Sequence, residues 1–378
     1  MKNIRPIAIY LPQYHPIPEN DKAWGEGFTE WTNVKKAKPL FKGHYQPHMP
    51  LEDVGYYDLS DPEVLVRQAE LANEYGIYGF AFYHYWFNGK RLLETPLDNM
   101  LKSGKPDFPF CYIWANENWT KRWDGADQEI IIKQDYSFDD DREHIHFLCK
   151  NVFNKENYIK ISGKALFVVY KPYLLKNPHE TAKLWRSVAA EYGIQLYLCH
   201  MVFSYNKDWQ KLVDGFDAVI DFEPFGIRRN DIFTEITKKR NKSLSFYQKI
   251  IIRFSYFFFK RAKLFSAQYN IMEYQWMFEN LNPLNNFPCK IYPSIVPSWD
   301  NTARRKNDPG LILKNSSPDL FEKWLCIIKK DFTPYSAEEN FIFINAWNEW
   351  AEGNHLEPCK KWGYAYLNKV KNIFVNKL

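Results

Sequence analysis

Eight apolar runs of strand length recur along the chain, with polar or helical segments between them. These runs are rich in β-branched and aromatic residues, as expected of strands that are buried on both faces of a sheet. Because helical segments separate them, the pattern predicts an α/β fold, a single (β/α)8 TIM barrel over residues 1–378. The expected strands are Ile7–His15, Ile77–Phe87, Phe108–Asn116, Ala165–Pro172, Gln195–Val202, Asp217–Pro224, Lys290–Trp299 and Phe341–Trp350.

Two of the helical segments begin and end in the same way. Each starts with a capping side chain, a proline in the first turn and an early acid, at 60–63 and 177–180. Each then finishes with Glu-Tyr-Gly-Ile, at 74–77 and 191–194, where glycine suits the left-handed position beyond a helix end. This recurrence, without a Ser/Gly-rich linker or a break in composition, predicts repeated βα units in one domain.

Two connections are much longer than the others. Residues 16–61 follow the first expected strand, and residues 225–288 follow the sixth as an insertion. Long loops at the carboxyl end of barrel strands usually shape the substrate site. We therefore expect both connections to border that site.

The net charge of +5 is concentrated in one part of the chain. Residues 228–263 contain eleven Lys and Arg residues and two acids, which leaves a net charge of −4 on the rest. This distribution gives no argument for a nucleic-acid partner. Within the basic part, Ser243–Lys263 is also aliphatic and aromatic. It is interpreted either as an interfacial helix on an anionic membrane or as a helix packed on the barrel with its lysines in water.

The composition, with 46% hydrophobic and 25% charged residues, is that of a soluble globular protein. Six scattered cysteines without a C-x-x-C pair suit reduced thiols. The first apolar run ends at Pro12 and predicts no signal peptide, and no run of eighteen apolar residues predicts a membrane span. We expect a cytoplasmic protein, located at the inner face of the membrane if Ser243–Lys263 binds lipid.

Polar and aromatic side chains gather where the expected strands end. In a parallel barrel these ends share one rim, which is where active sites lie. A polyhydroxylated ligand needs a hydrogen-bond partner for each hydroxyl and an aromatic ring for each apolar sugar face. The candidate substrate-binding residues are Tyr10, Gln13, Tyr14, Tyr83, His84, Trp86, Trp114, Asn116, Glu117, Tyr170, His200, Glu223, Trp299, Asp300, Trp347 and Asn348.

Single members of this set also have ordinary explanations. His84 or His200 alone is more often a hydrogen-bonded core histidine than a catalytic one. Glu117 and Glu223 could each pair with a nearby arginine, and Asp300 precedes two arginines that could pair with it. Their joint position at one rim, rather than any single residue, predicts a glycan site.

The last expected strand ends in two carboxylates, Glu349 and Glu352, with asparagine and tryptophan around them. Two carboxylates beside aromatic rings are the minimal set of groups for cleaving or forming a glycosidic bond. A solvated strand end with surface glutamates is the simpler alternative. No H-E-x-x-H, phosphate-binding loop or G-x-S-x-G is present in the sequence, so we expect no metal, no cofactor and no serine nucleophile.

Six strings between about residues 5 and 370 resemble, in order, the WbsX family. That family is described as glycosyltransferases of bacterial surface-polysaccharide loci, and it is similar to glycoside hydrolase family 99, the endo-α-mannosidases. The strings are Tyr10–His15, Trp24–Trp31, Phe82–Trp86, Trp114–Trp119, Trp299–Thr302 and Asn345–Gly353.

The resemblance implies a barrel enzyme that acts inside mannose-containing or related glycans with retention of configuration. It implies Glu349 as the base that takes the proton of the sugar's own 2-hydroxyl, and Glu352 as the acid/base for the leaving oxygen. Aromatic surroundings would raise the pKa of the acid by desolvation. The implied partner is an oligo- or polysaccharide, for which a lipid-linked form is one candidate.

Two alternatives stay open at this point. One is a glycosyltransferase that builds a surface polysaccharide such as O-antigen or capsule. The other is a glycan-binding barrel without catalysis, which has no need of an acid.

Overall fold

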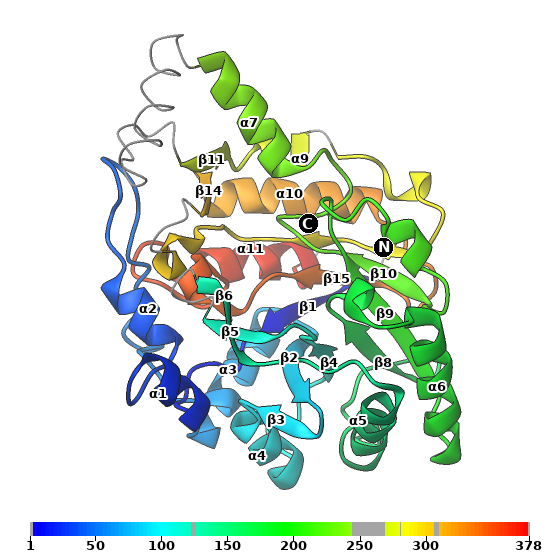
Figure 1. Cartoon of the computed structure of the whole chain (residues 1–378). Coiled ribbons are helices and arrows are strands. Elements are labelled where there is room, and N and C mark those ends of the chain that lie inside the picture. Colours follow the sequence, from blue (N-terminus) through cyan, green and yellow to red (C-terminus); the bar gives the residue numbers. More distant parts are fainter. Residues whose placement is uncertain (1–2, 122–125, 244–268, 280, 306–309, 377–378) are drawn as a thin grey trace.

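The computed structural model describes residues 3–121, 126–243, 269–279, 281–305 and 310–376, and its centre is a ring of parallel strands (Figure 1). The ring runs β1, β2, β4, β8, β9, β10, β12 and then β13, β15 and back to β1. The predicted barrel is therefore confirmed. Its strands are β1 (Arg5–Tyr10), β2 (Gly79–Phe87), β4 (Phe110–Trp114), β8 (Lys164–Val169), β9 (Leu196–Val202), β10 (Ala218–Asp221), β12 (Ile291–Tyr292), β13 (Ser294–Ile295) and β15 (Phe341–Ile344).

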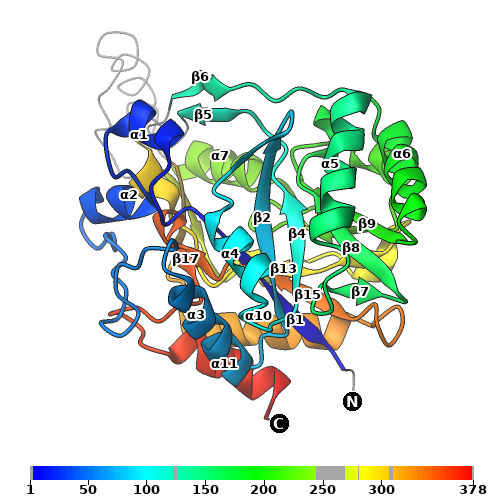
Figure 2. The ribbon, with the colours of Figure 1, turned by 90° about the horizontal axis from the view of Figure 1, so that it is seen from below.

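Helices surround this ring (Figure 2). They pack in neighbouring pairs, with α5 on α6, α10 on α11 and α3 on α4. The surrounding helices are α3 (Pro62–Glu74), α4 (Thr95–Ser103), α5 (Phe138–Asn151), α6 (Pro178–Glu191), α10 (Pro318–Asp331) and α11 (Ala365–Phe374).

The two helices with matching ends form as predicted. Asp61 caps α3 by accepting from a backbone amide of the first turn, and Asn177 caps α6 in the same way. Beyond the helix ends, Gly76 has φ 83° and Gly193 has φ 67°, which is the left-handed region that favours glycine.

All eight expected strands are shorter in the structure than predicted, and two of them end or break next to a proline. β1 ends at Tyr10, shortly before Pro12, and Pro293 divides the seventh barrel position into β12 and β13. Proline has no amide hydrogen for a ladder hydrogen bond, which explains both interruptions. The last strand, β15, ends at Ile344, and β16 (Asn348–Glu349) pairs instead with the antiparallel β17 (Asn354–His355).

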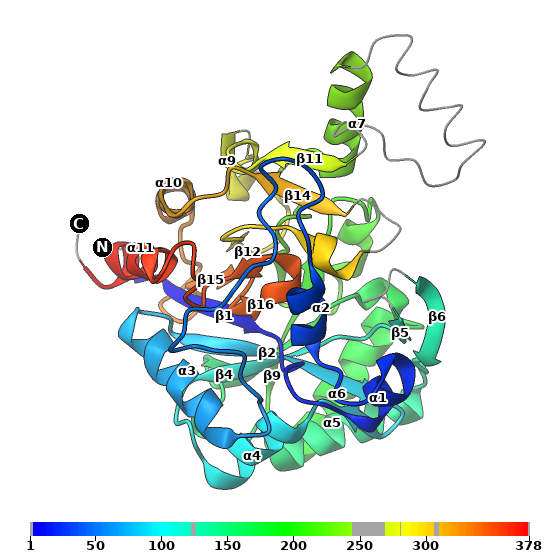
Figure 3. The ribbon, with the colours of Figure 1, turned by 90° about the vertical axis from the view of Figure 1, so that its left-hand side faces the viewer.

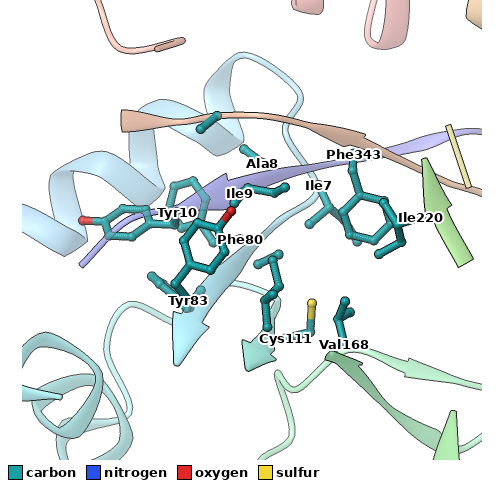
Figure 4. Close-up of a cluster of buried hydrophobic side chains, with 14 of the residues drawn as sticks. Ile7, Ala8, Ile9, Tyr10, Phe80, Tyr83, Cys111, Val168, Ile220 and Phe343 are labelled. Carbon is teal, nitrogen blue, oxygen red and sulfur yellow. The ribbon is translucent and has the colours of Figure 1, made fainter. Parts of the chain in front are cut away.

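Buried hydrophobic side chains of neighbouring strands pack together at the centre of the barrel (Figure 4). Ile7 of β1, Ile220 of β10 and Phe343 of β15 meet there, and none of the three is accessible to solvent. Burying one such side chain contributes about 1.5–3 kcal/mol to folding. The interior of the barrel is thus a packed core and no open channel.

The two long connections carry elements of their own. The first contains α1 (Pro18–Trp24) and α2 (Glu30–Lys36). The second contains α7 (Ile232–Ser243), β11 (Asn270–Glu273) and α9 (Trp276–Glu279), and β11 pairs with β14 (Leu311–Lys314) at one end of the molecule (Figures 1 and 3). The remaining strands lie beside the barrel: β3 (Lys90–Leu92), β5 (Trp119–Lys121), β6 (Ala126–Ile132) and β7 (Lys160–Ile161).

The basic segment Ser243–Lys263 lies, beyond Ser243, outside the described residues. Across the part of the chain that is described, each helix is too short or too polar to cross a bilayer. That residues 1–378 form one catalytic domain stays a prediction.

Candidate active site

A cavity of about 700 Å³ lies at the carboxyl ends of the barrel strands, the end at which barrel enzymes bind their substrates. Its walls come from the segments that follow β1, β4, β8 and β10, from β2, and from two short 3-10 helices, η6 (Asn301–Arg304) and η7 (Trp350–Glu352). Seven of the predicted residues line it: Gln13, Tyr83, Glu117, Tyr170, Trp299, Glu349 and Glu352.

The two predicted catalytic carboxylates stand at the two ends of η7. Glu349 ends β16 and caps η7, and Glu352 is the last residue of η7. Side chains three residues apart eclipse each other in a 3-10 helix, so both carboxylates face the same cavity. Gly353 ends the turn in the left-handed conformation, with φ 57°.

One guanidinium group joins the two carboxylates. Arg304, the last residue of η6, donates from Nη1 to Glu352 Oε1 and from Nη2 to Glu349 Oε2, both at 2.7 Å. Its Nε also donates to Oε2 of Glu30, the first residue of α2, at 3.0 Å. The planar donor fork of arginine suits such multiple contacts with carboxylates. Three carboxylates and one cation therefore form a buried group, which we call the carboxylate cluster.

Burial controls the proton affinity of this cluster. Burial raises the pKa of Glu349 to about 8, Arg304 acts against the rise, and Glu352 and Glu30 add to it. Burial, followed by the charge of Glu349, also raises the pKa of the Tyr83 and Tyr85 phenols. Both phenols therefore stay protonated at neutral pH and can donate hydrogen bonds in the cavity.

Gln13 offers an acceptor in the cavity wall. Its Nε2 donates to the Tyr85 hydroxyl at 2.7 Å, while its Oε1 is buried and has no hydrogen-bond partner among the described residues. A buried acceptor without a partner costs about 1–3 kcal/mol. A sugar hydroxyl that donates to this oxygen would remove that cost.

Aromatic rings form much of the remaining wall. Tyr170 lies edge-on to Phe222 at 5.4 Å between ring centres, and Phe225 lies edge-on to Trp299 at 5.3 Å. Towards solvent the wall continues in three exposed rings, which suits the apolar faces of sugars. These rings are Tyr173, Tyr205 and Phe233, with exposed fractions of 36%, 47% and 40%.

An ion pair between Lys171 and Glu117 completes the wall. Asn116 does not line the cavity, but its side chain donates to the Lys171 carbonyl at 2.8 Å and accepts from the Lys171 amide at 2.7 Å. Asn116 thus joins the segments that follow β4 and β8, and it positions the ion pair between Lys171 and Glu117.

Three further predicted residues join residues 347–350 to the end of β1. The Asn348 side chain binds both the amide and the carbonyl of Leu11, at 2.8 and 3.0 Å. The Tyr14 hydroxyl donates to the Asn348 carbonyl and accepts from the Trp350 amide. The Trp347 amide donates to the carbonyl of Ile9 in β1 at 2.7 Å. These contacts fix the segment that carries both carboxylates to the end of β1.

His84 and Trp86 lie outside the cavity, contrary to the expectation from their position in the sequence. Side chains alternate along a strand, so Tyr83 points into the cavity and its neighbour points to the helices. His84 contacts His144 at 3.0 Å between ring nitrogens, and Trp86 donates to Asp140 at 2.7 Å, both on α5.

Tyr10, Trp114 and His200 are also buried away from the cavity. The Tyr10 hydroxyl donates to Gln68 of α3 at 2.5 Å, and the Trp114 ring lies 5.9 Å from that of Trp185 on α6. These three residues join barrel strands to one another or to helices, so their aromatic character reflects the core.

Glu223 and Asp300 have partners that fix local structure. Glu223 forms a buried ion pair with Arg229, which is the ordinary explanation considered for it. Asp300 pairs with His44 at 2.6 Å and accepts from the Thr302 amide, so it caps η6. Hydrogen bonds from His44 and Thr302 outweigh burial and hold the pKa of Asp300 below its ordinary value.

Sequence reasoning missed Glu30 and Arg304 as members of the site. Glu30 lies within the string Trp24–Trp31, and Arg304 follows the string Trp299–Thr302 by two residues. The only sequence signal for Glu30 and Arg304 was that each lies in or beside a string that resembles the WbsX family. Tyr85 and Trp119, which also line the cavity, lie in or next to such strings as well.

Among the described residues, no group of three or more His, Cys, Asp or Glu side chains could hold a metal ion. Catalysis without a metal or another cofactor stays a prediction.

The fold is shared with solved carbohydrate enzymes. A "glycoside hydrolase-like protein" superposes with a TM-score of 0.59 at 16% identity, covering 99% of this chain and 94% of that one. The family 99 endo-α-mannosidase from Bacteroides thetaiotaomicron gives 0.55 in its complex with bis-tris-propane, at 14% identity, covering 98% and 95%. At these identities the likeness shows the fold.

Sequence relatives and a family model show the family. Two proteins named WxcX, from two strains of Xanthomonas campestris pv. campestris, are 36% identical over 369 and 370 residues. The match covers 97% of this chain, and the chain spans 49% of the length of each relative. The model of the family "Glycosyltransferase WbsX" matches residues 6–370. The chain belongs to the WbsX glycosyltransferase family.

Proposed function

We propose that the chain is an enzyme that acts on the glycosidic bonds of an oligo- or polysaccharide, with Glu349 and Glu352 as its catalytic carboxylates. The observation that carries the proposal is the pair of carboxylates, three residues apart, in an aromatic-walled cavity at the substrate-binding end of the barrel. A carboxylate pair beside sugar-binding rings is the usual requirement for glycosidic chemistry.

In the proposed reaction Glu349 takes the proton of the 2-hydroxyl of the sugar. The freed oxygen attacks C1 while the bond from C1 to the leaving oxygen breaks, and Glu352 gives its proton to that oxygen. Water then attacks C1 from the face that the leaving oxygen left, and the bond from C1 to the 2-oxygen breaks. Glu352 takes a proton from this water, and Glu349 returns its proton to the 2-oxygen. Two inversions at C1 give net retention. The raised pKa of Glu349 supports its role as base, because it makes this carboxylate a stronger proton acceptor.

The proposed substrate is a mannose-containing or related polysaccharide of the bacterial surface, attacked within the chain. The endo-α-mannosidase with the same fold supports the sugar, and the family name supports the pathway. The exposed rings at the cavity mouth support a substrate longer than one sugar.

A glycosyltransferase that builds such a polysaccharide is the second candidate. The family description favours it, and Lys171 in the cavity wall could bind an anionic leaving group. The acceptor would then be a sugar hydroxyl rather than water.

The test is cleavage of a panel of α-mannans and bacterial polysaccharides, with wild type beside Glu352→Gln and the anomer followed by NMR. Chain-internal cleavage with retention that the variant loses would support the hydrolase. Glu52→Gln is the matched control, because that side chain is 91% exposed and does not line the cavity.

Intact glycan binding without cleavage by the wild type would contradict hydrolysis and favour a transferase or a binding protein. Glu349→Gln separates these two. A transferase with its donor would lose turnover in this variant, while a binding protein would keep its affinity.

A further inference from the structure

Glu30 is the third carboxylate of the cluster, and the proposed reaction gives it no role. It is 1% exposed, and its Oε2 lies 3.0 Å from Nε and 2.9 Å from Nη2 of Arg304. Its other oxygen, Oε1, is buried without a hydrogen-bond partner among the described residues. A buried carboxylate is costly unless a cation or several donors compensate it, so its presence calls for an explanation.

Arg304 uses its three donor nitrogens on three different carboxylates. Nη1 binds Glu352, Nη2 binds Glu349, and Nε binds Glu30, whose Oε2 also contacts Nη2. The contact through Nε fixes the plane of the guanidinium. With this plane fixed, the two terminal nitrogens can point only at the oxygens that they now bind.

The charge of the cluster is not balanced. Three ionised carboxylates around one guanidinium would carry a net charge of −2 in a buried site. The phenols of Tyr14, Tyr83 and Tyr85 also face Glu349, and burial raises the pKa of each well above its ordinary value, so they contribute no positive charge. Two more cations line the same cavity: Lys171, which pairs with Glu117, and Arg305. Burial disfavours such a charge, and uptake of a proton by one carboxylate reduces it.

We propose that Glu30 is a positioning residue, which orients Arg304 between Glu349 and Glu352 and keeps a proton on this pair at neutral pH. The inference rests on the proposed function for its purpose, since a carboxylate pair that holds one proton provides both an acid and a base. The direction of the pKa shift of Glu349, to which the charge of Glu30 contributes, agrees with it.

The test needs no substrate. The carboxyl carbons of glutamate are labelled with ¹³C, Glu349 is assigned by the signal lost in Glu349→Gln, and its titration is followed by NMR in wild type and in Glu30→Gln. We expect the midpoint for Glu349 to fall by about one pH unit in Glu30→Gln, as one nearby charge is removed at intermediate dielectric.

Glu117→Gln is the matched control, because Glu117 lies in the same cavity and pairs with Lys171 instead of Arg304. It should leave the Glu349 midpoint within about 0.3 units of the wild-type value, because the charges that act on Glu349 are those of Arg304, Glu352 and Glu30. If Glu30→Gln does not fold, Glu30→Asp replaces it. Its shorter side chain withdraws the charge from Arg304, so the midpoint should move in the same direction by less.

An unchanged Glu349 midpoint in a folded Glu30 variant would overturn the inference. That result would leave the glycosidic reaction untouched, because activity on glycans is measured separately. Equally, absence of activity on every glycan would contradict the proposed function without changing the titration result.

Discussion

Arg304 limits what Glu349 and Glu352 can do as acid and base. It binds one oxygen of each carboxylate, and a hydrogen-bonded cation favours the ionised form. Burial favours the protonated form, and for Glu349 burial prevails, with a pKa of about 8. The two opposed effects act on the residue that the proposed reaction uses as its base.

This balance predicts the pH dependence of the reaction in the free enzyme. The proposed reaction needs one proton on the pair, with Glu349 ionised and Glu352 protonated, and this proton leaves the pair as the pH rises through about 8. We therefore expect kcat/KM to be level near neutral pH and to fall as the pH rises through 8. The profile is measured on the best substrate of the panel between pH 5 and 9.

A profile that rises from pH 6 to pH 8 and stays high above it would contradict this assignment. It would show that the reaction runs with both carboxylates ionised, so that the pair supplies no acid.

At the scale of elements, the 3-10 helix η7 depends on a glycine at its end. Gly353 has φ 57°, and a Cβ added there would lie 3.0 Å from the Asp300 Cβ and 3.0 Å from His48 Nε2. A side chain at this position would therefore meet tight contacts on both neighbours. Asp300 in turn caps η6, which carries Arg304, so a shift at this point reaches both sides of the carboxylate cluster.

Gly353→Ala should destabilise the protein by about 2–4 kcal/mol, the sum of a left-handed alanine and of overpacking. Gly363→Ala is the matched control, because Gly363 has φ 52° but nothing within 4 Å of its added Cβ. Its cost should be about 1–2 kcal/mol. Urea unfolding of the three proteins measures both values, and equal losses would contradict the close contact at Gly353.

At the scale of the whole molecule, the barrel places the cavity mouth between loops that come from many strands. The exposed rings of Tyr173, Tyr205 and Phe233 lie in the segments after β8, β9 and β10. All three line the same cavity as the carboxylate cluster. This arrangement suits a chain of sugars that extends from the cluster towards solvent.

Tyr205→Ala and Phe233→Ala should therefore weaken the binding of long glycans and leave short ones unaffected. Loss of one stacked ring, at about 1 kcal/mol, corresponds to roughly a fivefold rise in Kd. Calorimetric titration with α-mannan oligosaccharides of two to six units measures this. Phe138→Ala is the control, since Phe138 is equally exposed, at 42%, and does not line the cavity. A rise that is the same for every chain length would contradict the proposed extension.

Much of the fold could be predicted from the sequence, because the barrel strands are apolar along their whole length. The same property hid the direction of each side chain. In β2 every residue from Gly79 to Phe87 is buried, so no polar alternation distinguished Tyr83 from His84. The strand interruptions at prolines could have been predicted from the missing amide hydrogen.

The candidate site was predictable only in part. Glu349 and Glu352 lie close together in the chain, and a single motif presents both. Glu30 and Arg304 are 274 residues apart, and their contact depends on how the first long connection folds over the rim. An ion pair between two loops leaves no periodic pattern, so the sequence alone could not indicate it.

The carboxylate cluster also constrains how relatives of this chain can diverge. Replacing Arg304 alone would leave three buried carboxylates without their cation, at about 3–5 kcal/mol, a large share of the 5–15 kcal/mol by which proteins are stable. A change of Arg304 is therefore tolerated only together with changes of the carboxylates. Positions 30, 304, 349 and 352 should consequently vary together among the sequences of the family, although they lie in three separate parts of the chain.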